Sequence, residues 1–331
     1  MQDKKRVVVI GGGTGNFVVL SGLKKYYKEI DIVTIVDMTD SGGSNKRLID
    51  EFGLLPTSDI KQCLVALSPE TSKNSVLRQL FNYRFVSGEG IKGHHFGNLF
   101  MAALSDIMGS QKAAIEKTQE ILKVHGKIVP VTYEKCELVA EYEDGSRIKS
   151  EHLIDEPEGH DGKLRISKLY TEPFVTANPQ VLAEIESADL IILCSGDLFT
   201  SVLANVVVDG VAAAIKKSHA KKVYIMNLMT KMGQTYGFSA QDHLWEIEKY
   251  LGKSMNYVFV NNKPIPQEVA DAYAKEHEQQ VVDDLKSGYF KIIRGDFLSE
   301  NVVQKNEGDI LKRSLIRHDS DKLASELIKL V

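Results

Sequence analysis

The stretch RVVVIGGGTGNFVVLSGLKKY, residues 6–26, decides the fold. Its four consecutive apolar residues, 7–10, predict a strand that is covered on both faces, as strands of parallel sheets are. A glycine cluster follows, and apolar residues then recur at helical spacing over 17–26. Residues 31–36 are again mostly apolar and β-branched, which predicts a second strand. Strand, helix and strand in succession predict a βαβ unit with a right-handed parallel crossover.

The same alternation of elements continues along the chain and is interrupted once. Helical patterns occupy 58–67, 75–85, 97–108 and 112–124. An Asp144-Gly145 turn between alternating runs then predicts a small β-rich insertion over 127–170. Further strands are expected at 190–194, 222–228 and 257–260, and further helices at 178–186, 202–217, 242–251, 265–275 and 321–330. We therefore predict a single Rossmann-like three-layer α/β/α domain over 1–331, with a mostly parallel sheet, a helical middle segment and the β-rich insertion.

Composition and charge restrict the classes of protein that this chain can belong to. The 331 residues are 43% hydrophobic and 26% charged, which is typical of a globular protein. A formal net charge of −4 argues against a nucleic-acid binder. Cys63, Cys136 and Cys194 are widely scattered, so neither a disulfide framework nor a metal-ligand spacing is indicated. The apolar run 7–10 is too short for a signal peptide or a membrane span, so we expect a cytoplasmic protein.

The glycine cluster predicts a phosphate cradle. The nicotinamide fingerprint G-x-G-x-x-G would place its third glycine where this chain has Asn16, and the lysine of a Walker loop is missing. Bare glycines let backbone N–H groups approach a ligand, and a helix N-terminus favours negative charge. A phosphate or diphosphate is the expected ligand. The alternative is a tight strand-to-helix turn that binds no ligand. The candidate residues are Gly11, Gly12, Gly13, Thr14 and Gly15.

Three aspartates follow this cluster in the sequence. Asp37 and Asp40 leave the end of the second strand, and Asp59 comes soon after. Carboxylates beside a bound phosphate suit Mg²⁺, which takes oxygen ligands and is completed by substrate phosphates. Asp40 and Asp59 are the candidate metal ligands, and Asp37 is a candidate for ribose hydroxyls. Each alone could instead be a helix cap or a turn residue.

Other polar residues lie beside glycines or at the predicted ends of strands. Histidine and asparagine in GHHFGNL could hydrogen-bond a phosphate, sugar or base, or could cap a helix. Hydroxyls in SGDLFTS could grip a phosphate at a helix start or act as ordinary caps. The remaining ligand candidates are Gly42, Gly43, Ser44, His94, Asn98, Gly196, Thr200, Ser201, Asn227 and Thr230.

These motifs occur together in an order that resembles one family. VVIGGGTG, TDSGGS, a proline-containing SDI, GHHFGNL, SGDLFTSVLAN and NLMTKMGQTYGFSAQDHL follow one another over about 7–274. The set resembles the gluconeogenesis factor family, a branch of the 2-phospho-L-lactate transferase superfamily. The resemblance implies a Rossmann-like fold with a nucleotide-type ligand across the strand ends. It also implies binding of UDP-sugars and a role in carbon metabolism, cell shape and envelope synthesis.

The transferase branch implies a second hypothesis. That branch moves a phospholactyl group from a guanosine diphosphate donor to a deazaflavin alcohol, with a divalent metal on aspartates that match Asp40 and Asp59. We therefore keep a Mg²⁺-dependent transferase beside the nucleotide-sugar-binding regulator. A nicotinamide oxidoreductase is a third hypothesis, disfavoured by Asn16. The expected partner is a nucleotide or nucleotide-sugar diphosphate, and we also expect a homo-oligomer.

Three of the motifs depart from the family pattern. Ser41 stands where the branch usually has a second aspartate, which weakens the metal hypothesis. The usual Gly-Pro-Gly-Ser is Cys194-Ser195-Gly196-Asp197, so a carboxylate is added at its last position. The usual Gln-Asn-Gly-Glu-Thr begins here with Lys231. The added carboxylate could repel a phosphate or bind a metal, so ligand preference is expected to differ from that of other members.

Overall fold

The computed structural model describes residues 4–40, 42, 53–70, 72–156, 159–300 and 315–331. Its centre is the strand β1 (Lys5–Gly11), in which Val7, Val8, Val9 and Ile10 are fully buried. β1 pairs in parallel with β2 (Ile30–Val36) on one side and with β7 (Leu190–Leu193) on the other. The continuous apolar run is thus explained by burial on both faces of a parallel sheet.

The main sheet has seven strands in the order β10-β9-β8-β7-β1-β2-β3, and every pair within it is parallel. The remaining strands are β3 (Lys127–Pro130), β8 (Lys221–Ile225), β9 (Tyr257–Asn261) and β10 (Lys291–Gly295). The chain builds outward from β1 to β3 and then from β7 to β10 in the opposite direction. The order therefore reverses between β1 and β7, which is where open α/β sheets bind ligands, beyond the carboxyl ends of the strands.

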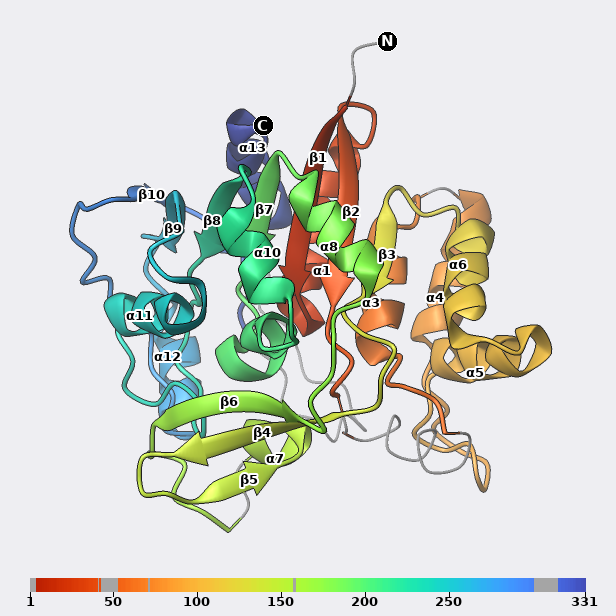
Figure 1. The fold of residues 1–331 in the computed structure, drawn as a ribbon, viewed down its shortest axis with the longest axis horizontal. Coiled ribbons are helices and arrows are strands. Elements are labelled where there is room, and N and C mark those ends of the chain that lie inside the picture. The colour runs from red at the N-terminus through yellow and green to blue at the C-terminus, as the bar shows by residue number, and fades with distance from the viewer. Residues whose placement is uncertain (1–3, 41, 43–52, 71, 157–158, 301–314) are drawn as a thin grey trace.

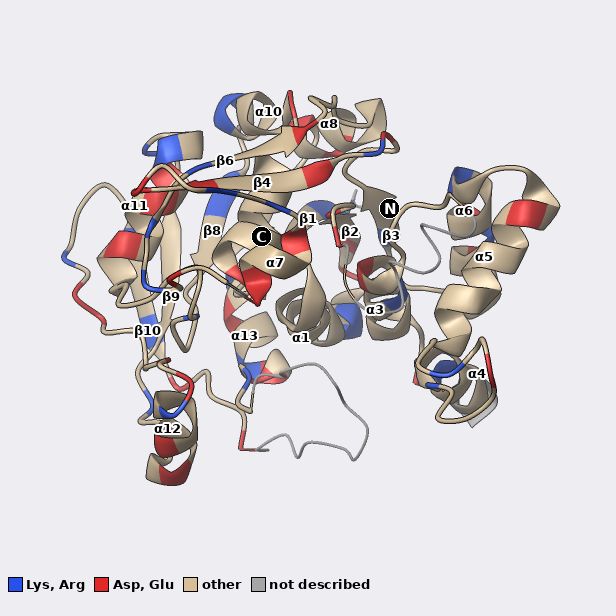
Figure 2. Cartoon of the chain, turned by 90° about the horizontal axis from the view of Figure 1, so that it is seen from below, with Lys and Arg blue, Asp and Glu red and all other residues tan. Residues whose placement is uncertain are grey.

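Helices cover both faces of this sheet, which confirms the three-layer α/β/α prediction (Figures 1 and 2). α1 (Gly13–Leu23) packs against α3 (Ser58–Leu67) and α13 (Ser320–Leu327) on one face. The opposite face carries α8 (Pro179–Glu186), α10 (Val211–Lys217) and α11 (Ala240–Leu251). Further helical elements of this part of the fold include α12 (Gln267–Ala274), the single turns Lys24–Tyr26 and Ile328–Leu330, and α9 (Ala204–Val206).

The predicted helical middle segment forms a lobe beside β3, at the right of Figure 1. It consists of α4 (Ser72–Asn82), α5 (Phe96–Met108) and α6 (Gln111–Leu122). Phe81 of α4 lies 5.2 Å from Phe100 and 6.2 Å from Phe96 of α5, measured between ring centroids. Aromatic rings at these separations attract one another, so this cluster holds α4 and α5 together.

A separate antiparallel sheet, β5-β4-β6, lies below the strand ends of the main sheet in Figure 1. It comprises β4 (Glu137–Tyr142), β5 (Arg147–Lys149) and β6 (Ile166–Glu172), with the short helix α7 (Glu151–Asp155) between the last two. Gly145 has φ 84° in the turn between β4 and β5, as the Asp-Gly signal predicts. The predicted boundary at 127 is wrong, because residues 127–130 are strand β3 and pair with β2 in the main sheet.

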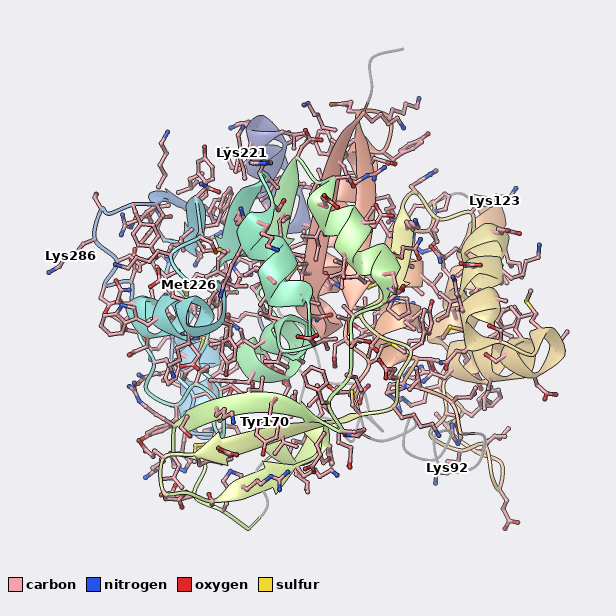
Figure 3. All side chains as sticks on the ribbon, in the orientation of Figure 1. Lys92, Lys123, Tyr170, Lys221, Met226 and Lys286 are labelled. Atoms are coloured by element: carbon pink, nitrogen blue, oxygen red, sulfur yellow. The ribbon has the colours of Figure 1, made fainter. Side chains whose placement is uncertain are left out.

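The main sheet presents its carboxyl ends to this small sheet. Figure 3 places Lys221, which opens β8, at the upper edge of the molecule. Met226 follows the end of β8 and lies lower, toward the small sheet that carries Tyr170. The loops after the parallel strands therefore emerge on the side where α7 and the small sheet are found.

The helix predicted over 202–217 is interrupted. A π-helix (Leu198–Leu203) runs into α9. The helix α10 then begins only after Gly210, where φ is 92°. Asp209 pairs with Thr176 in an isolated parallel bridge, so this segment is held by tertiary contacts that the periodicity did not reveal. π-helical turns are rare and are frequently found at functional sites. None of the helices in the described ranges is long and apolar enough to cross a membrane.

Candidate functional site

The glycine loop lies at the switch point between β1 and β7. α1 begins at Gly13 directly after β1, so its first backbone N–H groups face the carboxyl ends of the strands. A Cβ atom added to Gly15 would lie 2.6 Å from the backbone nitrogen of Gly196, in the loop after β7. Glycine is therefore required at position 15 because the two loops approach each other closely, and this contact brings two predicted motifs together.

Asn16 has a structural role at the position where the nicotinamide fingerprint has a glycine. Its fully buried side-chain amide donates to the Gly11 carbonyl (3.2 Å), Thr34 Oγ1 (3.0 Å) and Cys63 Sγ (3.4 Å). Its Oδ1 accepts from Cys194 Sγ at 3.3 Å. One side chain thus connects β1, β2, α3 and the end of β7, which fixes the base of the cradle.

Asp37 and Asp40 lie at the end of β2, beside this cradle. Asp37 is 3% exposed, and its Oδ2 accepts from Thr39 N (3.1 Å) and Thr39 Oγ1 (2.8 Å). Its Oδ1 has no hydrogen-bond partner among the described residues. Burial raises the pKa of Asp37 to about 6. Asp40 Oδ1 accepts from the Gly42 N–H at 2.9 Å, so this acid shapes its own turn.

Asp59 reaches the glycine loop from the first turn of α3. A Cβ atom added to Gly12 would lie 2.2 Å from Asp59 Oδ2, so the carboxyl group lies directly against the glycine loop. Burial raises the pKa of Asp59 to about 8, and the charges of Asp40 and Asp37 raise it further in the same direction. Asp37, Asp40 and Asp59 are therefore close enough to interact electrostatically at one point of the sheet edge.

The donors at this point are of the type that Mg²⁺ prefers. Among the residues that the structure describes, no group of three or more histidine, cysteine, aspartate or glutamate side chains is arranged to hold a metal ion. Mg²⁺ is usually bound by one or two carboxylates plus substrate phosphates, and a complete protein cage is not needed. Asp40 and Asp59 fit that arrangement as a pair, with a diphosphate supplying the other oxygens.

Two further acids come from α7 of the small sheet and were missed by the sequence analysis. Burial and the charges of Asp40, Asp155 and Asp37 raise the pKa of Glu151 well above its ordinary value. α7 carries its acidic residues beside the strand-end edge, which Figure 2 views directly. No sequence signal joins α7 to the acids after β2, because the contact arises only when the small sheet folds back over the strand ends.

A cation and an amide hold α7 in this position. Lys231 Nζ, in the loop after β8, lies 3.3 Å from Asp155 Oδ1 and 3.9 Å from Asp197 Oδ2. Although burial favours the neutral amine, the two carboxylates raise the pKa of Lys231 above its ordinary value. Gln234 Nε2 donates to Asp155 Oδ1 (2.9 Å) and to Thr200 Oγ1 (3.0 Å). The carboxylate added at Asp197 is thus paired with the lysine added at 231.

The predicted hydroxyl and amide residues divide into two groups. Ser201 faces the cradle, since its Cβ would lie 3.4 Å from a Cβ on Gly12. Asn227 and Thr230 make hydrogen bonds within the protein: Asn227 Nδ2 donates to the Gly196 carbonyl (2.8 Å), and Thr230 Oγ1 accepts from Gln279 N (3.0 Å). Thr200 Oγ1 accepts from Gln234, as described above. Ser201 is the hydroxyl residue that adjoins Gly12 of the glycine loop.

The residues of GHHFGNL approach the site from α5. His94 is 3% exposed and lies two residues before the start of that helix. Asn98 Nδ2 lies 3.5 Å from Ser58 Oγ, next to Asp59, so this motif borders the acidic side of the cradle. Gly43 and Ser44 lie outside the described residues, as does Ser41.

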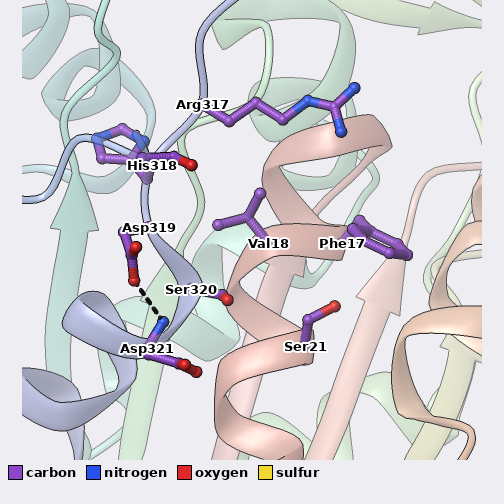
Figure 4. A pocket seen from close by; sticks show the side chains of 9 residues that line it. Phe17, Val18, Ser21, Arg317, His318, Asp319, Ser320 and Asp321 are labelled. Atoms are coloured by element: carbon purple, nitrogen blue, oxygen red, sulfur yellow. Dashed lines mark hydrogen bonds between the residues drawn. The ribbon is translucent and has the colours of Figure 1, made fainter. Parts of the chain in front are cut away.

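A pocket of about 290 Å³ lies between α1 and the segment that leads into α13 (Figure 4). The segment before α13 and the first residues of that helix form one wall, and the middle of α1 forms the other. His318 Nδ1 is 3.1 Å from Ser195 Oγ, next to the Gly196 that contacts the glycine loop, and burial lowers the pKa of His318 to about 4. The lining residues are Phe17, Val18, Ser21, Ser299, Arg317, His318, Asp319, Ser320 and Asp321. Sequence analysis missed this pocket because its walls are about 300 residues apart in the chain.

Fold and site together define an α/β protein with a glycine-rich cradle at the switch point of a parallel sheet. The family model described as 2-phospho-L-lactate transferase CofD matches residues 7–298. The chain belongs to this family, within its gluconeogenesis factor branch.

Relatives along the full length support this assignment. The gluconeogenesis factor of Bacillus subtilis is 35% identical over 336 residues, covering 100% of this chain and 99% of the relative. That of Halalkalibacterium halodurans is 38% identical over 316 residues, covering 92% and 95%. The crystal structure of protein BH3568 from Bacillus halodurans superposes with a TM-score of 0.88 at 35% identity, covering 98% of this chain and 100% of that chain. The fold is therefore that of the family throughout.

Proposed function

We propose that the chain is a cytoplasmic regulator that binds a nucleotide-sugar diphosphate of the UDP-sugar type. The regulated processes would be carbon metabolism, cell shape and envelope synthesis. The observation that carries this proposal is the start of α1 at the switch point, on a glycine loop next to Ser201. Backbone amides at a helix N-terminus bind phosphate, and the sheet order reverses at this point.

The layout of the site suggests how such a ligand would lie. Its diphosphate would rest on the glycine loop, between Asp59 and Ser201. Ser195 joins this loop to the pocket beside α1, so a ligand that extends past Gly196 reaches the pocket that His318 borders. The pocket volume of about 290 Å³ is at the lower end of small-molecule sites. A base or a sugar ring would be held there by both apolar and polar groups.

A thermal-shift and calorimetric screen tests the proposal. The ligands are UDP-N-acetylglucosamine, UDP, GDP and NAD, each with and without Mg²⁺. A ligand that binds only the folded protein stabilises it by about 2.7 kcal/mol at a hundred times its dissociation constant. Stabilisation by the UDP compounds and none by NAD is the expected result. If none of the nucleotides binds in either condition, the proposed function is wrong.

A Mg²⁺-dependent transferase is the second candidate, favoured by the pair Asp40 and Asp59 and by the description of the family. When bound, Mg²⁺ would neutralise charge on the diphosphate donor. An acceptor hydroxyl would attack phosphorus, the bond from phosphorus to the oxygen of the nucleoside monophosphate would break, and the hydroxyl proton would pass to solvent or a carboxylate. Positioning and charge stabilisation dominate such reactions. Release of nucleoside monophosphate that requires both the metal and an acceptor alcohol would identify this activity.

A further inference from the structure

The π-helix that follows β7 places one hydroxyl residue against both loops of the cradle. A Cβ atom added to Gly12 would lie 3.4 Å from Ser201 Cβ, and one added to Gly196 would lie 3.0 Å from it. A Cβ atom added to Gly13 would lie 4.0 Å from Ser201 Oγ. Ser201 is only partly buried, so a ligand on the glycine loop can reach it. Its hydroxyl therefore lies beside the amides that a phosphate at the start of α1 would use.

A buried amide one turn further along the chain holds this segment. Asn205, in α9, is 0% exposed, and its Nδ2 donates to the Ser201 carbonyl at 2.8 Å. The same Nδ2 reaches the carbonyl of Gly11, the last residue of β1, at 3.5 Å. Asn205 thus connects the π-helix to the strand that leads into the glycine loop. Because it is fully buried, it can act on a ligand only through the groups that it holds.

The unpaired side of this amide indicates which of its atoms matters. Both neighbours of Asn205 Nδ2 are carbonyl oxygens, so only the nitrogen of the amide can bond to them. Asn205 Oδ1 is buried and has no hydrogen-bond partner among the described residues. A buried acceptor without a partner is destabilising, and an apolar side chain of similar size would avoid that cost. The donor is therefore the group that accounts for an amide at this position.

The beginning of the π-helix is held separately, from the loop after β8. Gln234 is 1% exposed, its Oε1 accepts from Phe199 N at 3.2 Å, and its Nε2 donates to Thr200 Oγ1 at 3.0 Å. Ser201 follows directly, with Asn205 bound to its carbonyl. The segment is thus fixed on both sides of Ser201, and the Asn205 side carries the link to β1 and the glycine loop.

We propose that Asn205 is a positioning residue of the phosphate cradle, which holds the Ser201 hydroxyl over the first amides of α1 so that it donates to a phosphate oxygen of the ligand. This inference rests on the proposed function and deepens it, since it names the side-chain donor of the diphosphate subsite and the residue that orients it. Without the amide, the π-helix loses its bond to β1, and the hydroxyl is free to leave the loop.

A double-mutant cycle in binding tests this role. The probes are inorganic pyrophosphate and UDP-N-acetylglucosamine, titrated by calorimetry against the wild type, Asn205→Leu, Ser201→Ala and the double variant. Asn205→Leu keeps a side chain of similar size and removes the donor together with the unpaired acceptor. We expect each single variant to lose about tenfold in affinity for pyrophosphate, and the double variant to bind no more weakly than Ser201→Ala.

Urea denaturation of the same proteins separates positioning from stability. Asn205→Leu should change the free energy of unfolding little, whereas loss of a merely structural residue would lower stability and leave the affinity unchanged. Ser218→Ala is the matched control, because the buried Ser218 Oγ donates to the Ile185 carbonyl (2.9 Å) just before β8, at the opposite edge of the sheet. This control should lose stability and bind as the wild type does. If Asn205→Leu fails to fold, Asn205→Ala replaces it in the cycle.

The outcomes distinguish this inference from the proposed function. An unchanged pyrophosphate affinity in Asn205→Leu overturns the positioning role, as does a loss that is equally large in the Ser201→Ala background. Either result leaves the proposed function standing if the wild type binds the nucleotide sugar. If pyrophosphate shows the expected coupling and the nucleotide sugar does not bind, the positioning role is supported and the proposed function fails. A wild-type protein that binds neither probe overturns both.

Discussion

Lys231 Nζ lies 3.3 Å from Asp155 Oδ1, and this ion pair joins the loop after β8 to the short helix of the small sheet. Asp197 approaches the same lysine at 3.9 Å from the loop after β7. Asp155 and Asp197 thus share one cation. This charged junction fastens the small sheet to the loops at the strand ends.

Replacement of this lysine should destabilise the protein measurably. Lys231→Met leaves Asp155 and Asp197 without their cation, and because the lysine side chain is only 21% exposed we expect a loss of about 1–2 kcal/mol. Urea denaturation followed by the fluorescence of the single tryptophan, Trp245, measures the loss. Lys329→Met is the control, because its pair with Glu326 is exposed and should be worth less than about 0.5 kcal/mol. Equal losses in both variants would show that the Lys231 ion pairs stabilise the protein no more than an exposed surface pair does.

Asn16→Gly tests whether the incomplete nicotinamide fingerprint has a structural cause. The substitution restores G-x-G-x-x-G but removes an amide with four buried partners, which leaves the Gly11 carbonyl, Thr34 and two thiols with fewer hydrogen bonds. We expect a loss of about 2–4 kcal/mol in unfolding free energy, and no binding of NAD. Chemical denaturation and an NAD titration measure the two effects. A stable variant that binds NAD would contradict the role assigned to Asn16.

The sequence predicts the parts of this molecule whose signals are local. β1 and β7 are recognisable because strands buried on both faces must be apolar without interruption. The cradle and Asp37 are recognisable because they directly follow such strands. β10 was not predicted, because its sequence KIIRG is short, is charged near both ends and is only partly buried at the edge of the sheet. The helix break at Gly210 was hidden because it depends on a bridge to Thr176.

The parts of the site that could not be predicted are contacts between distant segments. Glu151 meets the acids after β2 only because the small sheet folds back across the strand ends. His318 meets Ser195 only because α13 packs on α1, and these residues are 123 positions apart. Neither histidine nor glutamate carries a local pattern that distinguishes it from a surface residue. Periodicity can therefore identify elements and strand-end loops, but not the walls that other segments add to them.

The buried Asp37 predicts a particular dependence of stability on pH. Its folded pKa of about 6 lies above its ordinary value of 3.8, so the folded state holds this proton more tightly than the unfolded state. Its contribution to stability is therefore present below about pH 4 and is lost as the pH rises through about 6. Asp37→Asn removes that loss, so the variant should gain stability relative to the wild type at pH 8 but not at pH 4.

Urea denaturation of the two proteins across this range checks the prediction. The quantity compared at each pH is the unfolding free energy of the variant minus that of the wild type. This difference removes the effect of His243 and His318, whose pKa values are lowered in both proteins alike. Those histidines reduce stability as the pH falls below about 6.5, in the opposite direction. A difference between variant and wild type that does not change from pH 4 to pH 8 would contradict the burial of a titrating Asp37.

Filling the pocket beside α1 tests whether it belongs to the ligand site. Ser21 lies on the α1 wall and is only partly buried, so Ser21→Trp should enter the pocket with a small effect on stability, within about 1 kcal/mol. We expect the affinity for UDP-N-acetylglucosamine to fall at least about tenfold, while pyrophosphate, which needs only the cradle, binds as before. Calorimetry with both ligands distinguishes the two regions. An unchanged affinity for the nucleotide sugar would place its base and sugar elsewhere.

The contact between Gly12 and Asp59 can be measured as a coupling energy. Gly12→Ala alone places a methyl group 2.2 Å from Asp59 Oδ2, so the carboxyl group must move, and we expect a loss of about 1–3 kcal/mol. In the Asp59→Ala background the same methyl group has room, and the loss should fall below about 1 kcal/mol, which gives a coupling of the size found for residues in contact. Gly288→Ala is the control, because an added Cβ meets its nearest atom at 3.9 Å. Urea denaturation of the four proteins of the cycle provides the values. If Gly12→Ala costs the same with and without the Asp59 side chain, the carboxyl group does not rest on the glycine loop.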